Sequence, residues 1–276
     1  MLGAADNGLS ISRPEVVQRI RTDMGLDQPL PIQYLRWLGG AVHGDFSMSY
    51  VRRRPVADVI AERLPSTLEL AGAGMLVAVV VGLTLGMAAA LRRDTPLDGL
   101  TMIVSLGDVS TPNFFFAMLL VLTFSVALGW FPATGSGGLD RLVLPALALG
   151  YQGAALVARI TRASMLEVLN RPYVTTAWAK GLPPRPVVLR HALRNALVPI
   201  VTVVGLQIGQ LLAGSVIVEM IFARQGIGQL AIESILAKDY PMMQPVILFT
   251  ASAYVLTNLL VDILYGYLNP QIRASA

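Results

Sequence analysis

The chain has 276 residues, of which 54% are hydrophobic and only 14% are charged, and its 21 Lys and Arg outnumber its 17 Asp and Glu. A soluble fold of this size is excluded, because too few charged side chains remain to cover its outside, whereas an integral membrane protein is solvated by lipid. The absence of cysteine excludes disulfides and thiolate sites, and two histidines, His43 and His191, are too few for a histidine-rich metal site. We therefore expect an all-α, polytopic membrane protein without a metal site.

Residues 1–64 contain no apolar run of spanning length and are expected to form an extracytoplasmic amphipathic segment. A capping box at residues 12–15 predicts a helix that ends at Gly25. A second short amphipathic helix is expected over residues 32–38, stopped by the glycines at 39–40.

Five stretches free of Asp, Glu, Lys and Arg predict five membrane-spanning helices in a permease-like domain over residues 65–276. A spanning helix needs about 20 mostly apolar residues, so the short third stretch is expected to continue past Arg159, whose long side chain can reach the interface. The five stretches are 70–91, 109–139, 142–158, 195–218 and 240–261.

Positive charge gathers between the third and fourth predicted spans, where residues 159–194 hold seven basic residues and one acid, Glu167. The positive-inside rule places this loop, the turn at Arg92 and Arg93, and the C-terminus in the cytoplasm. The N-terminal segment holds eight basic residues and would lie outside, against the rule. Such a segment is poorly translocated without an apolar helix ahead of it, so we expect the natural protein to have one more helix before Met1.

The loop over 159–194 has the pattern of two helices joined by a rigid corner. Helical composition over 161–180 ends at Gly181, a residue type suited to a helix C-terminus. Prolines at 183, 184 and 186 predict a tight turn, and residues 187–197 predict a second helix that enters the membrane. Taken alone, this pattern fits a solvated basic loop equally well.

Residues 173–182, YVTTAWAKGL, resemble the coupling loop of binding-protein-dependent ABC importer permeases, with the closest likeness to the oligopeptide, dipeptide and nickel branch. The likeness runs from about residue 24 to the C-terminus, and it departs from the family pattern at Trp178, where arginine is common, and at Asp108, where a small residue is usual. The other matching stretches are 26–31, 34–38, 44–46, 63–70, 124–126, 129–132, 161–165, 190–195, 218–219, 222–223, 226–228, 239–241, 258–262 and 270–273.

The resemblance implies a type I importer permease of a bacterial or archaeal plasma membrane, from a family whose members carry six spans. It implies a second homologous permease subunit, two cytoplasmic ABC ATPase subunits that bind the ATP, and an extracytoplasmic substrate-binding protein. It implies no cofactor in this chain and no nucleic-acid partner. The cytoplasmic loop would dock on an ATPase and couple it to the pore. The residues that the resemblance assigns to this coupling are Tyr173, Thr175, Thr176, Ala177, Trp178, Lys180 and Gly181.

Polar residues inside the predicted spans are candidates for lining the transport pathway, because an aqueous path through lipid requires polar walls. We assign this role to Gln207, Gln210 and Asn258, and to Asp108, the acid directly before the second stretch. The chain has no phosphate-binding loop, nucleophile elbow or zinc-protease motif, so we expect a transport subunit and not an enzyme. Peptides are the expected solute, nickel or another small solute remains an alternative, and a secondary transporter or channel is the alternative from a different class.

Overall fold

The computed structural model describes residues 27–268, without the side chains of 108–110, 262 and 264–268. These described residues are almost entirely helical, and an isolated bridge joins Met48 to Pro55. The helices are α2 (Leu30–Val42), α3 (Val56–Leu91), α4 (Pro96–Ser110), α5 (Asn113–Leu120), the π-helical turn η1 (Val121–Ala127), α6 (Asp140–Leu169), α7 (Pro172–Ala179), α8 (Pro184–Pro186), the π-helical turn η2 (Val187–Leu193), α9 (Arg194–Ile221), α10 (Ile227–Leu236) and α11 (Tyr240–Leu268).

Four helical stretches in the described part of the chain are long and apolar enough to cross a membrane. They confirm the first, third, fourth and fifth predicted spans, and the first three of them extend past their apolar runs into residues that include charged side chains. The third span does continue past Arg159, since α6 ends at Leu169. The four stretches are Val56–Leu91, Asp140–Leu169, Pro184–Ile221 and Tyr240–Val261.

The second predicted span, 109–139, was wrong as a single helix. Pro112 lacks a backbone N–H and has an extended backbone (φ −60°, ψ 141°), so α4 ends at Ser110 and α5 starts afresh at Asn113. The helical part then ends at Ala127 and a glycine-rich loop follows to residue 139. Of the predicted span 109–139, the described structure thus keeps only the short helical part α5–η1, and α4 lies almost entirely before it.

Helix α4 was not predicted, and an ion pair at its start fixes it to α6. The Arg162 guanidinium donates from Nε to Asp98 Oδ1 at 2.5 Å and from Nη2 to Asp98 Oδ2 at 2.7 Å. Such a two-point contact sets both distance and orientation, because the planar guanidinium matches the planar carboxylate.

Close packing of α3 on α6 forms the centre of the molecule, and small residues make it possible. Along α3, Gly74, Gly82 and Gly86 recur at intervals that keep them on one buried face. A Cβ at Gly82 would lie 2.6 Å from the Cβ of Val157, and a Cβ at Gly150 would lie 2.5 Å from the Gly74 carbonyl oxygen. Two helices in lipid gain no hydrophobic free energy by associating, because lipid tails are apolar as well. Van der Waals contact between closely spaced backbones, which small residues allow, stabilises their packing instead.

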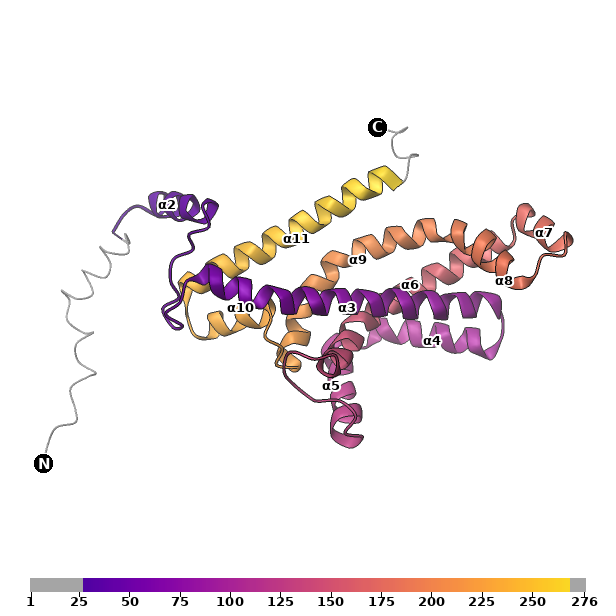
Figure 1. Cartoon of the computed structure of the whole chain (residues 1–276), viewed down its shortest axis with the longest axis horizontal. Coiled ribbons are helices and arrows are strands. Elements are labelled where there is room, and N and C mark those ends of the chain that lie inside the picture. The colour runs from indigo at the N-terminus through magenta and orange to yellow at the C-terminus, as the bar shows by residue number, and fades with distance from the viewer. Residues whose placement is uncertain (1–26, 269–276) are drawn as a thin grey trace, which may run out of the picture.

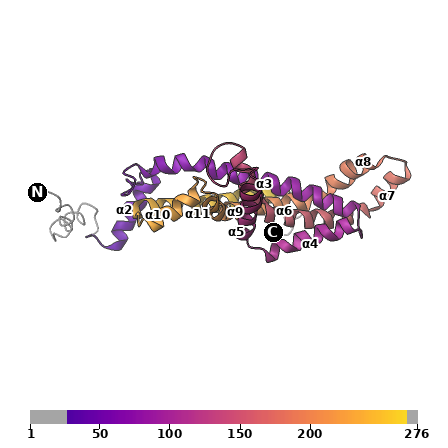
Figure 2. The same cartoon turned by 90° about the horizontal axis from the view of Figure 1, so that it is seen from below.

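The molecule is elongated, with α7 and α8 at one end and α2 and α10 at the other, and α3 runs between them (Figures 1 and 2). We call these the loop end and the distal end. An apolar cluster closes the distal end by joining the start of α3 to α10 and α11. Its buried members are Val56, Val59, Ile60, Ile227, Leu230, Met242 and Val246.

Helix α2 confirms the second amphipathic helix predicted in the N-terminal segment, but its predicted end was wrong. The helix runs through the glycines at 39–40 to Val42, because glycine weakens a helix by only about 1 kcal/mol. The helix predicted over 12–25 lies outside the described residues. The domain boundary expected at residue 64 falls inside α3, which begins at Val56.

Candidate functional site

The loop over 159–194 forms a rigid projection at the loop end of the molecule (Figure 1). The prediction of one helix over 161–180 was wrong, because α6 ends at Leu169 and α7 begins at Pro172. Arg171 has an extended backbone (ψ 144°), the conformation that a following proline imposes. The chain therefore turns at this point, and α7 is a separate short helix at the tip of the projection.

A small apolar core fixes α7 to its neighbours. Val174 is fully buried and Ala177 is 6% exposed, and both pack with Val187 of η2 and with Val168 and Leu169 of α6. Because the two buried residues of α7 are three apart, they lie on one face of the helix. Among the residues assigned to coupling, Ala177 therefore belongs to the core beneath the loop.

The rest of the α7 surface is exposed, and two large aromatic side chains border its buried face on either side. Tyr173 is 43% exposed and Trp178 is 42% exposed, and Thr175, Thr176 and Lys180 are exposed beside them. Asn195 at the start of α9 donates from Nδ2 to the Tyr173 hydroxyl oxygen at 3.0 Å. The exposed surface of α7 thus carries two aromatic side chains of the kind that is enriched in protein interfaces, with polar groups around them.

Gly181 ends α7 with the left-handed backbone that its sequence position predicts, and this prediction is confirmed (φ 76°). The N–H of Gly181 donates to the Trp178 carbonyl at 2.9 Å, and the N–H of Leu182 donates to the Ala177 carbonyl at 3.3 Å. These two bonds form a Schellman motif, which satisfies the last carbonyls of the helix and reverses the chain sharply.

After the turn at Gly181, the chain is helical without interruption from Pro184 to Ile221. The predicted proline corner and second helix are therefore confirmed, and the projection continues directly into a membrane-length helix. A buried apolar cluster ties this helix to α3 and α6 where it leaves the projection. The members of the cluster are Ala90, Met165, Val188, Ala192 and Ala196.

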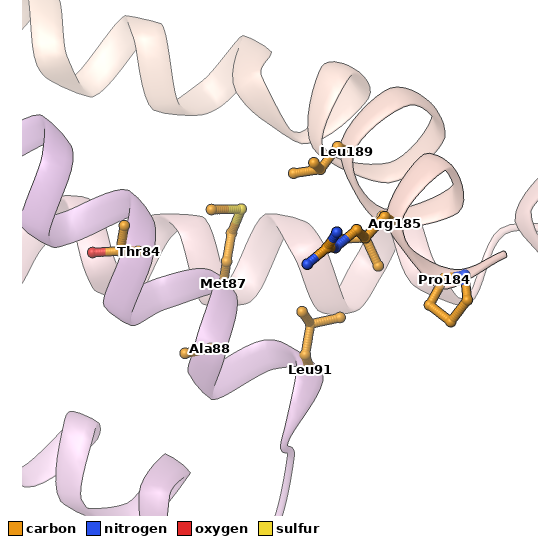
Figure 3. A pocket seen from close by; sticks show the side chains of 8 residues that line it. Thr84, Met87, Ala88, Leu91, Pro184, Arg185 and Leu189 are labelled. Atoms are coloured by element: carbon orange, nitrogen blue, oxygen red, sulfur yellow. The ribbon is translucent and has the colours of Figure 1, made fainter.

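A groove of about 390 Å³ separates the last turns of α3 from α8 and η2. In Figure 3, Met87 and Leu91 of α3 lie across the groove from Arg185 and Leu189. Its lining is almost wholly apolar apart from Thr84 and Arg185. The projection thus packs closely on α6, whereas on this side the groove separates it from the end of α3.

A second, polar cavity of about 240 Å³ lies between α6, α9 and the start of α5. It contains two of the predicted pathway residues, Gln207 and Gln210. Gln207 is 3% exposed and donates from Nε2 to the Gly153 carbonyl at 3.4 Å, while its Oε1 has no partner among the described groups. Gln210 is exposed. The same cavity is also lined by Asn113, Gln152 and Arg159. None of these three residues was assigned to the pathway from the sequence.

The two other predicted pathway residues, Asn258 and Asp108, are not among the described residues that line this cavity: Asn258 lies elsewhere, and the side chain of Asp108 is not described. Asn258 of α11 packs on the opposite side of α9, where its Oδ1 would lie 2.6 Å from a Cβ at Gly209. Asn258 is not among the residues that line the polar cavity. Asp108 is in α4, in the stretch whose side chains the structure does not describe.

A buried polar cluster at the distal end joins two sequence motifs that lie about 150 residues apart. Glu219 is fully buried and accepts hydrogen bonds from Thr67 Oγ1 at 2.7 Å and from the Gln229 N–H at 3.0 Å. Arg224, 1% exposed, pairs with Glu69. The resemblance included 63–70 and the short stretches 218–219, 222–223 and 226–228, but not Arg224, and only the fold shows that these segments form one cluster.

This cluster requires glycine at position 226. A Cβ there would lie 2.2 Å from the carboxyl carbon of Glu219, so any side chain would displace the buried carboxylate. The turn between α9 and α10 is thereby held against α3. Its rigidity fixes the distal ends of these helices relative to one another.

Comparison with known proteins agrees with this architecture. The model of the family described as binding-protein-dependent transport system inner membrane component matches residues 82–274, and the model of the N-terminal part of such components matches residues 7–71. The glutathione transport system permease protein GsiC of Escherichia coli (strain K12) is 45% identical over 259 residues, which cover 94% of this chain and 85% of the relative. The protein of the same name from Shigella dysenteriae serotype 1 matches to the same extent.

Two solved structures share the fold at low sequence identity. The inward-facing MetNI methionine ABC transporter superposes with a TM-score of 0.62 at 17% identity, covering 76% of this chain and 96% of that one. An amino acid ABC transporter crystallised with histidines gives a TM-score of 0.58 at 17% identity, covering 75% and 93%. Together with the family match over most of its length, these likenesses show that the chain belongs to the binding-protein-dependent inner membrane components, the permease subunits of ABC importers.

Proposed function

We propose that this permease conducts peptides through the membrane, together with a second homologous permease subunit. The observation that carries the proposal is the 45% identity, over 94% of this chain, to a permease named for glutathione, which is itself a small peptide. Two cytoplasmic ATPases drive the transport, and an extracytoplasmic binding protein delivers the solute.

The loop end is the cytoplasmic end, and the exposed face of α7 is the contact with an ATPase. Three features support this assignment: Tyr173 and Trp178 are exposed, the loop is basic, and α7 is packed rigidly on α6 and η2. Because the projection continues into the helix over Pro184–Ile221, a displacement of α7 is transmitted to a membrane span as a rigid-body motion. The C-terminus lies on the same, cytoplasmic side.

The polar cavity between α6 and α9 is part of the transport pathway. Lipid cannot satisfy the amide groups of Gln152, Gln207 and Gln210, so the face that carries them turns toward water or toward the second permease. The solute passes along this face when the two permeases rock against each other.

A solute panel tests the proposal in proteoliposomes that hold the complete importer. Glutathione, a neutral tripeptide and Ni²⁺ are offered outside, with ATP enclosed on the side of the ATPases. The proposal predicts ATP-dependent uptake of one or both peptides and none of Ni²⁺. Uptake of Ni²⁺ alone would replace peptide by metal as the solute, while uptake of none of the three would refute the peptide assignment.

A further inference from the structure

The polar cavity contains a positive charge that has no carboxylate partner among the described side chains. Arg159 is half-buried on α6, and its Nη1 donates to the Ser105 carbonyl at 3.2 Å. None of the ion pairs of the described part of the chain includes it. Arg162, one turn further along α6, is by contrast fully engaged with Asp98.

Arg159 belongs to one polar face of the cavity. Gln152 and Arg159 are seven residues apart on α6, and Gln207, Gln210 and Gly214 repeat at intervals of three and four on α9, so each helix presents a single stripe to the cavity. The other polar side chains of these stripes are amides, which are neutral and both donate and accept hydrogen bonds. The charge of the cavity therefore comes from Arg159.

A cationic side chain inside a membrane-length helix is costly and marks a path for ions or solutes. Its field is strong there, because low-dielectric walls screen it less than water does. We propose that Arg159 binds an anionic group of the transported solute, which in a peptide is its carboxylate, as the solute passes the cavity. This inference rests on the proposed function and adds a charge preference to it.

The absence of cysteine from the chain allows a direct test of the charge in the cavity. A cysteine placed at Gln210 is labelled, in the complete importer, with a negatively charged sulfonate and with a positively charged trimethylammonium methanethiosulfonate reagent. The inference predicts faster labelling by the anionic reagent, and a fall in the anionic-to-cationic rate ratio of roughly fivefold to twentyfold in Arg159→Gln. Arg159→Lys should keep the preference.

Two controls separate an electrostatic effect from a structural one. A cysteine at Leu139, which is 78% exposed and outside the cavity, should show a ratio that Arg159→Gln leaves unchanged. Gln152→Glu leaves Arg159 in place and adds a negative charge to the same cavity, so it should also lower the ratio at position 210. If Arg159→Gln fails to assemble, the rate ratio at position 210 with Arg159 in place still tests the inference, because faster labelling by the cationic reagent would overturn it.

The inference is overturned if Arg159→Gln leaves the ratio at position 210 unchanged. It is also overturned if the anionic preference appears only after Asp108→Asn, or only without the second permease, because an acid of the importer would then neutralise Arg159. Absence of labelling at position 210 by either reagent would instead refute the water-filled pathway, and with it the inference. A failure of the peptide assignment would be seen separately, in the uptake assay with the solute panel, because that assay does not depend on the labelling rates.

Discussion

Replacing Gly181 by valine isolates the role of the turn that ends α7. The residue has φ 76°, and a Cβ built on it meets nothing within 4 Å, so the substitution changes backbone strain without a steric clash. A non-glycine residue in this left-handed region costs about 1–2 kcal/mol, and a β-branched one lies at the upper end. Since about 1.4 kcal/mol is a tenfold change in an equilibrium, the native turn loses roughly 5- to 30-fold in population relative to other loop conformations.

This cost is small against the about 5–15 kcal/mol that stabilises a folded domain, so the variant should insert and fold. We expect ATP-dependent uptake to fall by about fivefold or more in proteoliposomes, because the turn no longer holds α7 in the position in which we propose that it contacts an ATPase. Gly181→Asn should retain most of the activity, since asparagine tolerates this conformation.

Gly44→Val provides the matched control away from the loop end. Gly44 has nearly the same backbone (φ 79°) and an equally open surrounding, but it lies near the distal end of the molecule. Its variant should leave ATP-dependent uptake unchanged. Wild-type uptake by a well-expressed Gly181→Val variant would refute the reasoning.

Three further substitutions test the proposed ATPase contact of α7, the packing of α3 on α6 and the buried polar cluster. Trp178→Ala removes an aromatic side chain that is 42% exposed, and it should weaken co-purification of the ATPase subunits without lowering the membrane level of the permease. Gly82→Leu forces a side chain against Val157 and should destabilise the α3–α6 packing by about 1–3 kcal/mol or more, seen as a lower melting temperature of the purified complex. Thr67→Val removes a donor to the buried Glu219 carboxylate and the acceptor of the Ile227 N–H, and it should cost about 1–3 kcal/mol; an unchanged melting temperature would show that these two hydrogen bonds contribute nothing.

Local signals explain what the sequence could predict. Four spans followed from long apolar runs, and the left-handed turn at Gly181 followed from a glycine placed after a helical stretch and before prolines. These features depend on residues close together in the chain. The break at Arg171 also had a local signal, the proline at 172, but helical composition on both sides outweighed it in the prediction.

Contacts between distant segments explain what the sequence could not predict. Helix α4 is tied to α6 by Asp98 and Arg162, which are 64 residues apart, and nothing local indicates that pair. Gln207 and Asn258 both suited a polar pathway by residue type, yet they pack on different sides of α9. From the sequence, Arg159 was interpreted only as a side chain at the membrane boundary. Its position in the cavity depends on how α6 packs against α9, which no local pattern indicates.

We infer that this chain is a transport subunit and that separate ATPase subunits supply the energy. The energy source of transport is therefore the property to measure. Solute uptake is measured in proteoliposomes with the complete importer, in turn with enclosed ATP, with a proton or sodium gradient and no ATP, and with the purified permease alone. We predict uptake only with ATP and the ATPase subunits present, and no ATP hydrolysis by the permease alone. Uptake driven by an ion gradient in the absence of ATP would contradict this prediction and identify a secondary transporter.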